Sequence, residues 1–298
     1  MRILAILYLV LFTQTFVHAQ LPLFVGGVNK LQSLIDPNNS KEYRNMKGGL
    51  YLHTNGWCDL NREEQDSLIE TFSGHEIVIE IGGPSKKDNW PMGIKDMYMA
   101  RGIVPKYFLS NFQNAGGDTS DLNEWVNFCV DISAVYSYSR CDPPTILPNF
   151  EYANHNSNHN DLYNHRVSRF DLYKKLVKYS GGLSIDSPPR VFIERDDSYR
   201  GWVMDAINYC NKNGLVSVLI VSPHTSEDKF KTDTHMMLRY LFVNECFPQI
   251  LVIENYSYNH LIYKDRPYYN LIGDENQENS VMGVAKYVAE HLTANSTN

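Results

Sequence analysis

The stretch Ile250-Leu-Val-Ile-Glu254-Asn255 decides the fold, because it places an unbroken apolar run directly before a carboxylate. Two other runs have the same form, Ile77-Val-Ile-Glu80 and Val191-Phe-Ile-Glu194. Strands with one face in water alternate between apolar and polar residues, whereas parallel strands buried on both faces are apolar throughout. The three runs therefore predict a parallel sheet whose strands end in acidic residues.

Similar short segments recur along the chain, and longer helical stretches separate them. The predicted strands are Gly49–His53, Glu76–Ile81, Lys106–Ser110, Thr145–Glu151, Arg190–Arg195, Val216–Ser222, Ile250–Glu254 and Tyr269–Gly273. The predicted helices are Asn61–Phe72, Met92–Arg101, Leu122–Ser139, Leu162–Tyr179, Gly201–Asn211, Thr232–Glu245 and Val281–Leu292. This alternation is typical of the α/β class, and the first strand lacks the glycine-rich phosphate loop of an open doubly wound sheet. The predicted fold is therefore a single (β/α)8 TIM-type barrel.

The first residues have the form of an export signal. Arg2 precedes an apolar run from Ile3 to Val17, and Val17 and Ala19 are the small residues that signal peptidase requires. The run is shorter than the roughly 20 residues of a membrane-spanning helix, so we expect cleavage after Ala19 rather than the alternative, a membrane anchor. Residues 1–19 are predicted to be a signal peptide, 20–47 a leader that caps the barrel, 48–294 the barrel and 295–298 a tail. The mature chain is expected to be secreted or periplasmic.

The composition sets limits on the partners of this chain. Of its 298 residues, 43% are hydrophobic and 20% are charged, as in an ordinary globular protein, and the formal net charge is −7. No block of Lys or Arg offers a surface for phosphates, so a nucleic-acid partner is not expected. No segment after the signal is long and apolar enough to span a membrane, so a membrane partner is not expected either. We expect a monomer without a cofactor.

Five cysteines follow the predicted signal: Cys58, Cys129, Cys141, Cys210 and Cys246. An odd number in an exported protein leaves at least one thiol unpaired, and the wide spacing matches no zinc motif. A disulfide between Cys129 and Cys141 remains open, and most of these cysteines are expected to be small buried residues.

In a (β/α)8 barrel, the functional residues lie at the carboxyl ends of the strands and in the loops that follow them. Several glutamates at these ends would repel one another, which raises the pKa of at least one of them and yields a protonated acid. The 20 tyrosines and the tryptophans offer ring faces on which sugars stack. The residues expected to contact substrate are His53, Asn55, Trp57, Glu80, Asn111, Asn149, Tyr152, Arg195, His224, Asn255 and Tyr256.

Glu151 closes the fourth predicted strand and Glu254 closes the seventh. This layout resembles that of the clan A retaining glycoside hydrolases, which are (β/α)8 barrels. The resemblance implies that a poly- or oligosaccharide is cleaved with Glu151 as the acid/base and Glu254 as the nucleophile. Glu194, at the end of the fifth predicted strand, is a further catalytic candidate. The sequence departs from the clan pattern because Phe150 separates Asn149 from Glu151.

Two other functions are compatible with the same residues. Glu151, Glu194, His224 and Glu254 lie on neighbouring predicted strands and could bind Mg²⁺, Mn²⁺ or Zn²⁺ in a metal-dependent sugar hydrolase, lyase or isomerase. Their spacing matches no metal motif, so no metal is assigned. A barrel that only binds saccharide, without catalysis, is the third hypothesis.

Overall fold

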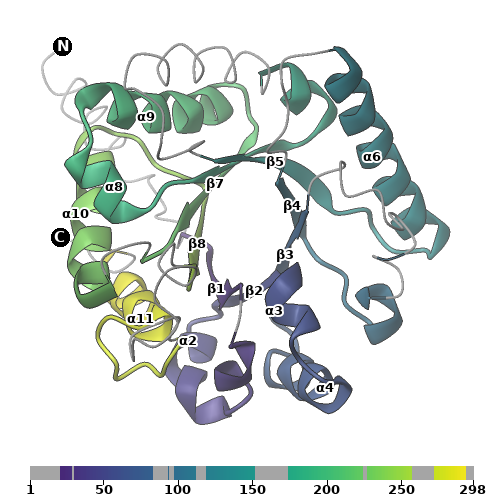
Figure 1. The fold of residues 1–298 in the computed structure, drawn as a ribbon, viewed down its shortest axis with the longest axis horizontal. Helices are drawn as coiled ribbons and strands as arrows, with labels where there is room; N and C mark the ends of the chain where they lie inside the picture. The colour runs from purple at the N-terminus through teal and green to yellow at the C-terminus, as the bar shows by residue number, and fades with distance from the viewer. Residues whose placement is uncertain are drawn as a thin grey trace, which may run out of the picture.

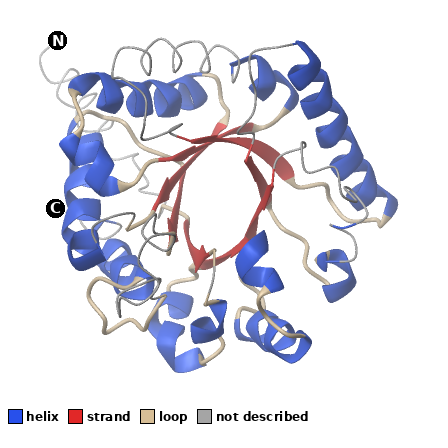
Figure 2. Cartoon of the chain, viewed as in Figure 1, coloured by secondary structure: helices blue, strands red, loops and turns tan. Residues whose placement is uncertain are grey.

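The computed structural model describes residues 21–28, 30–82, 93, 97–111, 119–151, 174–223, 227–256 and 272–292. Its strands are β1 Leu23–Gly27, β2 Gly49–His53, β3 Ile77–Gly82, β4 Tyr107–Asn111, β5 Thr145–Glu151, β6 Gly182–Asp186, β7 Val216–Val221 and β8 Ile250–Glu254. Each strand pairs in parallel with the next, and β8 closes on β1. In Figure 2 the strands form a ring that the helices surround. The predicted (β/α)8 barrel is confirmed.

Two of the eight strands differ from the prediction. Strand β1 lies within residues 20–47, the segment predicted to be a leader that caps the barrel. The predicted strand Arg190–Arg195 is wrong, because Pro189–Glu194 forms helix α8 and the sixth strand is Gly182–Asp186. In the predicted strand Tyr269–Gly273, residues 269–271 lie outside the described part, and Ile272 and Gly273 belong to no strand.

The reason for the error at 190–195 is local. Pro189 occupies the first turn of α8, where its fixed φ and missing N–H favour a helix. The apolar run behind it packs by one face, with Phe192 buried and Val191 half-buried. A short apolar run cannot by itself distinguish a buried strand from a short helix.

The longer helices agree with the sequence analysis. The helices are α2 Lys41–Asn45, α3 Thr54–Cys58, α4 Arg62–Thr71, α6 Thr119–Tyr138, α8, α9 Asp197–Lys212, α10 Phe230–Val243 and α11 Val281–Leu292. The 3-10 turns are η1 Leu31–Leu34, η2 Pro37–Ser40, η3 Met99–Arg101, η4 Val177–Tyr179 and η5 Glu227–Lys229. Of the predicted helix Leu162–Tyr179, residues 162–173 lie outside the described part, and residues 92 and 94–96 of the predicted helix Met92–Arg101 do so as well. The last three residues of Met92–Arg101 form the 3-10 turn η3. Helix α4 begins with a capping box, in which Asn61 and Glu64 each accept the other's backbone N–H.

The core has two layers, because successive side chains of a strand point to opposite faces. The inner layer fills the barrel and consists of Phe24, Tyr51, Val78, Leu109, Leu147, Val218, Ile220, Ile250 and Val252. The alternate residues, such as Ile79 and Ile253, pack outward in a second cluster with residues of the surrounding helices. In Figure 1, α8, α9 and α10 cover one side of the ring, and α11 lies beside α2. The inward positions above the inner layer therefore form the mouth of the barrel.

All five cysteines are free thiols, so the disulfide considered between Cys129 and Cys141 is not formed. Cys129, Cys210 and Cys246 are buried, as expected for small core residues. Burial raises the pKa of Cys129 and Cys210 to about 12 and that of Cys246 to about 11, which keeps these thiols neutral. Among the described residues, no helix has the length and apolar character needed to cross a membrane.

Buried tyrosines make the fold sensitive to alkaline pH. Burial is the main reason that the pKa values of Tyr43, Tyr51, Tyr98 and Tyr136 are raised above the usual 10.0. Above about pH 10 the unfolded chain loses these protons whereas the folded chain keeps them, so stability falls as the pH rises. Each tyrosine should lower the free energy of unfolding by about 1.4 kcal/mol per pH unit above pH 10, and by nothing below it.

This expectation is tested by urea unfolding at increasing pH, together with the ultraviolet absorbance of tyrosinate. Part of the tyrosinate absorbance should develop only with loss of the folded circular dichroism signal. Ionisation of all 20 tyrosines in the folded state near pH 10 would contradict it.

Candidate functional site

Acidic side chains ring the inner face of the barrel at its mouth. Glu80 on β3 and Glu254 on β8 are each only 4% exposed, and Asp186 on β6 is half-buried. The negative charges of all three carboxylates help to raise the pKa of Tyr51, which lies on β2 in the inner layer. Three carboxylates from separate strands are thus gathered around one buried tyrosine, and Glu80, Asp186 and Glu254 are called the acidic ring below.

Tyr51 holds Glu80 in place. The Tyr51 hydroxyl donates a hydrogen bond to Glu80 Oε2. Burial, followed by the charges of Glu254 and Glu80, raises the pKa of Tyr51 well above 10.0. The hydroxyl therefore stays protonated and remains a donor, which favours the ionised form of the carboxylate that it contacts.

His53 is directed toward the same carboxylate. Its Nδ1 accepts the backbone N–H of Asn55 at 3.1 Å, where it caps helix α3. In a neutral imidazole the other nitrogen then carries the proton, and this Nε2 lies 3.7 Å from Glu80 Oε1. Thr54 Oγ1 donates to the Glu80 carbonyl oxygen at 2.8 Å. Glu80 is thus fixed from the end of β2 at both its side chain and its backbone.

Two uncharged polar side chains, Asn149 and Ser184, form a hydrogen bond between β5 and β6. Ser184 Oγ donates to Asn149 Oδ1 at 3.0 Å, and both residues are buried. Two residues farther along these strands, Glu151 pairs with Asp186 in the sheet register. Asn149 was predicted to belong to the site, and the structure places it just below the acidic ring.

The seam between β8 and β1 is closed by Asn255. This buried side chain accepts the backbone N–H of Val28 at 2.9 Å through Oδ1. A Cβ on Gly27 would lie 1.9 Å from the same oxygen, so only glycine leaves room for the contact. Asn255, expected to bind substrate, therefore links the ends of β8 and β1. Tyr256 follows it and is half-buried.

Several predicted site residues are not brought to the acidic ring. Glu194 is exposed on α8 and pairs with Arg190 at 2.5 Å, and Arg195 follows the helix. Trp57 is 1% exposed in the outer core, where its indole N–H donates to the Met97 carbonyl at 3.2 Å. Glu194 is therefore the last residue of a helix, and not the last residue of a barrel strand as the sequence predicted.

Other predicted residues lie outside what the structure describes: Tyr152 and His224 altogether, and the side chains of Asn111 and Glu151. The backbone places Glu151 at the end of the fifth strand and Glu254 at the end of the eighth, rather than the fourth and seventh. The strand positions on which the clan A resemblance rested are therefore corrected. Of the residues considered as metal ligands, Glu194 lies on helix α8. No three of the described His, Cys, Asp and Glu side chains are placed so that they could hold one metal ion.

Sequence reasoning missed Tyr51, Ser184 and Asp186. Tyr51 sits within an apolar strand and resembles a core residue. The other two belong to Gly182-Leu-Ser-Ile-Asp186, whose alternating polar residues before Ser187-Pro188 are a usable strand signal. Strand alternation also places Tyr51 and His53 on one face, which would have identified both as interior residues.

Comparison with known proteins gives a fold likeness and no family. No protein-family model and no curated protein sequence matches the chain. Among solved structures, it is similar to the glycoside hydrolase domain of PgaB (BpsB) from Bordetella bronchiseptica, with 8% identity and a TM-score of 0.43. The match covers 78% of this chain and 92% of that one. A similarity at this level identifies no substrate, and the function has to be argued from the site.

Replacement of Tyr51 by phenylalanine tests the contact with Glu80. The change leaves a buried carboxylate without its hydroxyl donor, so Tyr51→Phe should lower the free energy of unfolding at neutral pH by about 1.5–3 kcal/mol. Tyr136→Phe is the matched control, because the buried Tyr136 hydroxyl has no hydrogen-bond partner among the described residues. Urea unfolding of both variants gives the comparison. Equal effects of the two substitutions would show that the hydroxyl of Tyr51 has no special role.

Proposed function

We propose that this chain is a glycoside hydrolase that cleaves a poly- or oligosaccharide with two carboxylates of the barrel mouth. The observation that carries the proposal is the burial of Glu80 and Glu254 around the hydroxyl of Tyr51. Carboxylates that share a desolvated site differ in their tendency to ionise, which provides one anionic and one protonated group. Glycoside hydrolysis needs that combination.

Glu80 is assigned as the nucleophile. The Tyr51 hydroxyl donates to Glu80, and His53 lies close to the same carboxylate, so these two neighbours stabilise the ionised form of Glu80. Its carboxylate attacks the anomeric carbon while the bond from that carbon to the leaving oxygen breaks. The product of this step is a glycosyl ester on Glu80.

Glu254 is assigned as the acid/base. It protonates the leaving oxygen in the first step, then takes a proton from the water that hydrolyses the ester. Glu80 and Glu254 stand on β3 and β8, three strands apart around the closed barrel. The clan A resemblance implies the same separation, between strands four and seven, for its acid/base and nucleophile. The roles of nucleophile and acid/base are thus proposed for Glu80 and Glu254, which both lie near Tyr51.

Export belongs to the same proposal. Cleavage after Ala19 would retain Leu21, the first of the described residues that packs against the core, and strand β1, which begins at Leu23. An exported chain meets extracellular saccharide, which is the substrate class proposed for the acidic mouth.

Glutamine variants test the two roles. Glu80→Gln and Glu254→Gln should each lower kcat on aryl glycosides by about a thousandfold or more, because an amide can neither attack nor transfer the proton. Glu194→Gln is the matched control and should retain wild-type kcat, since Glu194 is exposed and lies on α8. Turnover on a panel of 4-nitrophenyl glycosides gives the three values. Near wild-type turnover by either buried variant would reject the assignment and direct the search to Glu151.

A further inference from the structure

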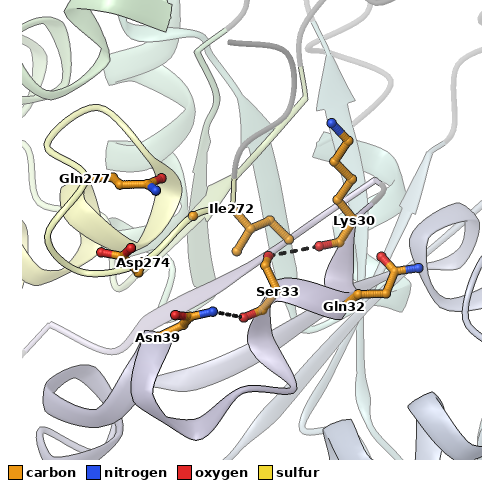
Figure 3. Close-up of a pocket in the computed structure, with 8 residues that line it drawn as sticks. Lys30, Gln32, Ser33, Asn39, Ile272, Asp274 and Gln277 are labelled. Carbon is orange, nitrogen blue, oxygen red and sulfur yellow. Dashed lines mark hydrogen bonds between the residues drawn. The ribbon is translucent and has the colours of Figure 1, made fainter. Parts of the chain in front are cut away.

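A pocket of about 410 Å³ lies beside the β8–β1 seam, outside the acidic ring. One wall follows β1 and contains Lys30, Gln32, Ser33 and Asn39. The other wall precedes α11 and contains Ile272, Gly273, Asp274 and Gln277. In Figure 3, Gln277 and Asp274 face Ser33 and Lys30 across Ile272. The volume is within the range of small-molecule sites.

The pocket is connected to the candidate active site through a short path. Glu254 is followed by Asn255, whose side chain accepts the backbone N–H of Val28, and Lys30 lies two residues beyond Val28. Both walls belong to connections that leave the carboxyl ends of β8 and β1. A saccharide chain bound at Glu254 would therefore reach this pocket if it crossed the β8–β1 seam.

The two walls are held together independently of any ligand. The buried Glu275 carboxylate accepts the backbone N–H groups of Glu42 and Tyr43 at 3.1 and 2.7 Å, which attaches the loop before α11 to helix α2. Asp274 Oδ1 accepts the N–H of Asn276 at 2.7 Å, and its carbonyl accepts the Ser280 hydroxyl at 3.0 Å. On the opposite wall, Asn39 Nδ2 donates to the Ser33 carbonyl at 2.7 Å. The pocket is thus preformed, which reduces the entropy cost of binding.

The lining combines apolar surface with several polar groups, and its formal charge is balanced. Its polar groups are the amides of Gln32, Asn39 and Gln277 and the hydroxyl of Ser33, and the buried Ile272 lies beneath them. Lys30 and Asp274 contribute one positive and one negative charge. Amides can donate to and accept from sugar hydroxyls. Balanced charge favours an uncharged ligand over an anionic one.

We infer that this pocket is an accessory subsite for a neutral sugar unit of the same saccharide that is cleaved at the barrel mouth. The inference rests on the proposed function for the identity of the saccharide. It assigns Gln32 and Gln277, whose side chains are exposed on opposite walls, as residues that hold the distant part of a long substrate.

The test compares long and short neutral ligands. Cellohexaose, xylohexaose and chitohexaose are titrated calorimetrically into full-length Glu254→Gln, with the matching disaccharides and hexagalacturonate alongside. In the background of Gln32→Ala with Gln277→Ala, the Kd of the neutral hexasaccharide that binds should rise roughly tenfold, while that of its disaccharide stays unchanged. Gln249→Ala is the matched control, because Gln249 is exposed at the opposite, amino end of β8.

Each outcome decides one of the two proposals. Three results would overturn the subsite. The Kd of the neutral hexasaccharide could be unchanged by the two glutamine substitutions, or none of the neutral probes could bind. The third result is that the substitutions change only the Kd of hexagalacturonate. Wild-type hydrolysis of aryl glycosides with any of those results leaves the proposed function standing. Conversely, the glutamine substitutions could raise the Kd of the neutral hexasaccharide while the wild-type protein hydrolyses no glycoside. That result would support the subsite and reject the proposed hydrolase activity.

Discussion

The hydrogen bond from the Tyr51 hydroxyl to Glu80 is the contact on which the mouth of the barrel depends. A carboxylate that is 4% exposed loses most of its hydration, and such a group persists only with donors that replace the water. Tyr51 supplies that donor from the inner core layer, and His53 approaches from the other side of the carboxylate. The same residue therefore packs the barrel and organises its chemistry.

The closed barrel explains why these groups meet. Parallel strands place all their carboxyl ends at one face, and strand alternation sends every second side chain inward. One step above Val78 and Val252 of the inner layer, these rules bring Glu80 and Glu254 to the same space. Closure at β1 and β8 needs Gly27, where a side chain would collide with the Asn255 oxygen that binds Val28. The seam that closes the barrel thus borders the candidate site.

The sequence predicted the fold because several of the buried parallel strands are continuous apolar runs separated by longer helical segments, as at Ile250–Glu254. The prediction of strands failed where the strand propensity of the residues was weak or where an apolar run could form either a strand or a helix. The Gly-Leu-Ser-Ile-Asp segment of β6 has few strand-forming residues, while the apolar run after Pro189 formed a helix. These errors shifted the numbering of the strands and placed Glu194 in the site. Glu80 and Glu254 were predicted to lie at the mouth of the barrel, where the structure places them. Tyr51 was missed because a tyrosine within an apolar strand looks like an ordinary core residue.

The central claim is that Glu80 is the nucleophile of a two-carboxylate site. It is tested most directly by incubating the enzyme with a 2-deoxy-2-fluoro aryl glycoside, which slows hydrolysis of a glycosyl ester, and by locating the trapped sugar through mass spectrometry of peptic peptides. The account predicts a single label on Glu80, carried by the peptide that contains Ile77–Gly82. A label on Glu254, Glu151 or Glu194, or turnover with inversion and no label at all, would contradict it.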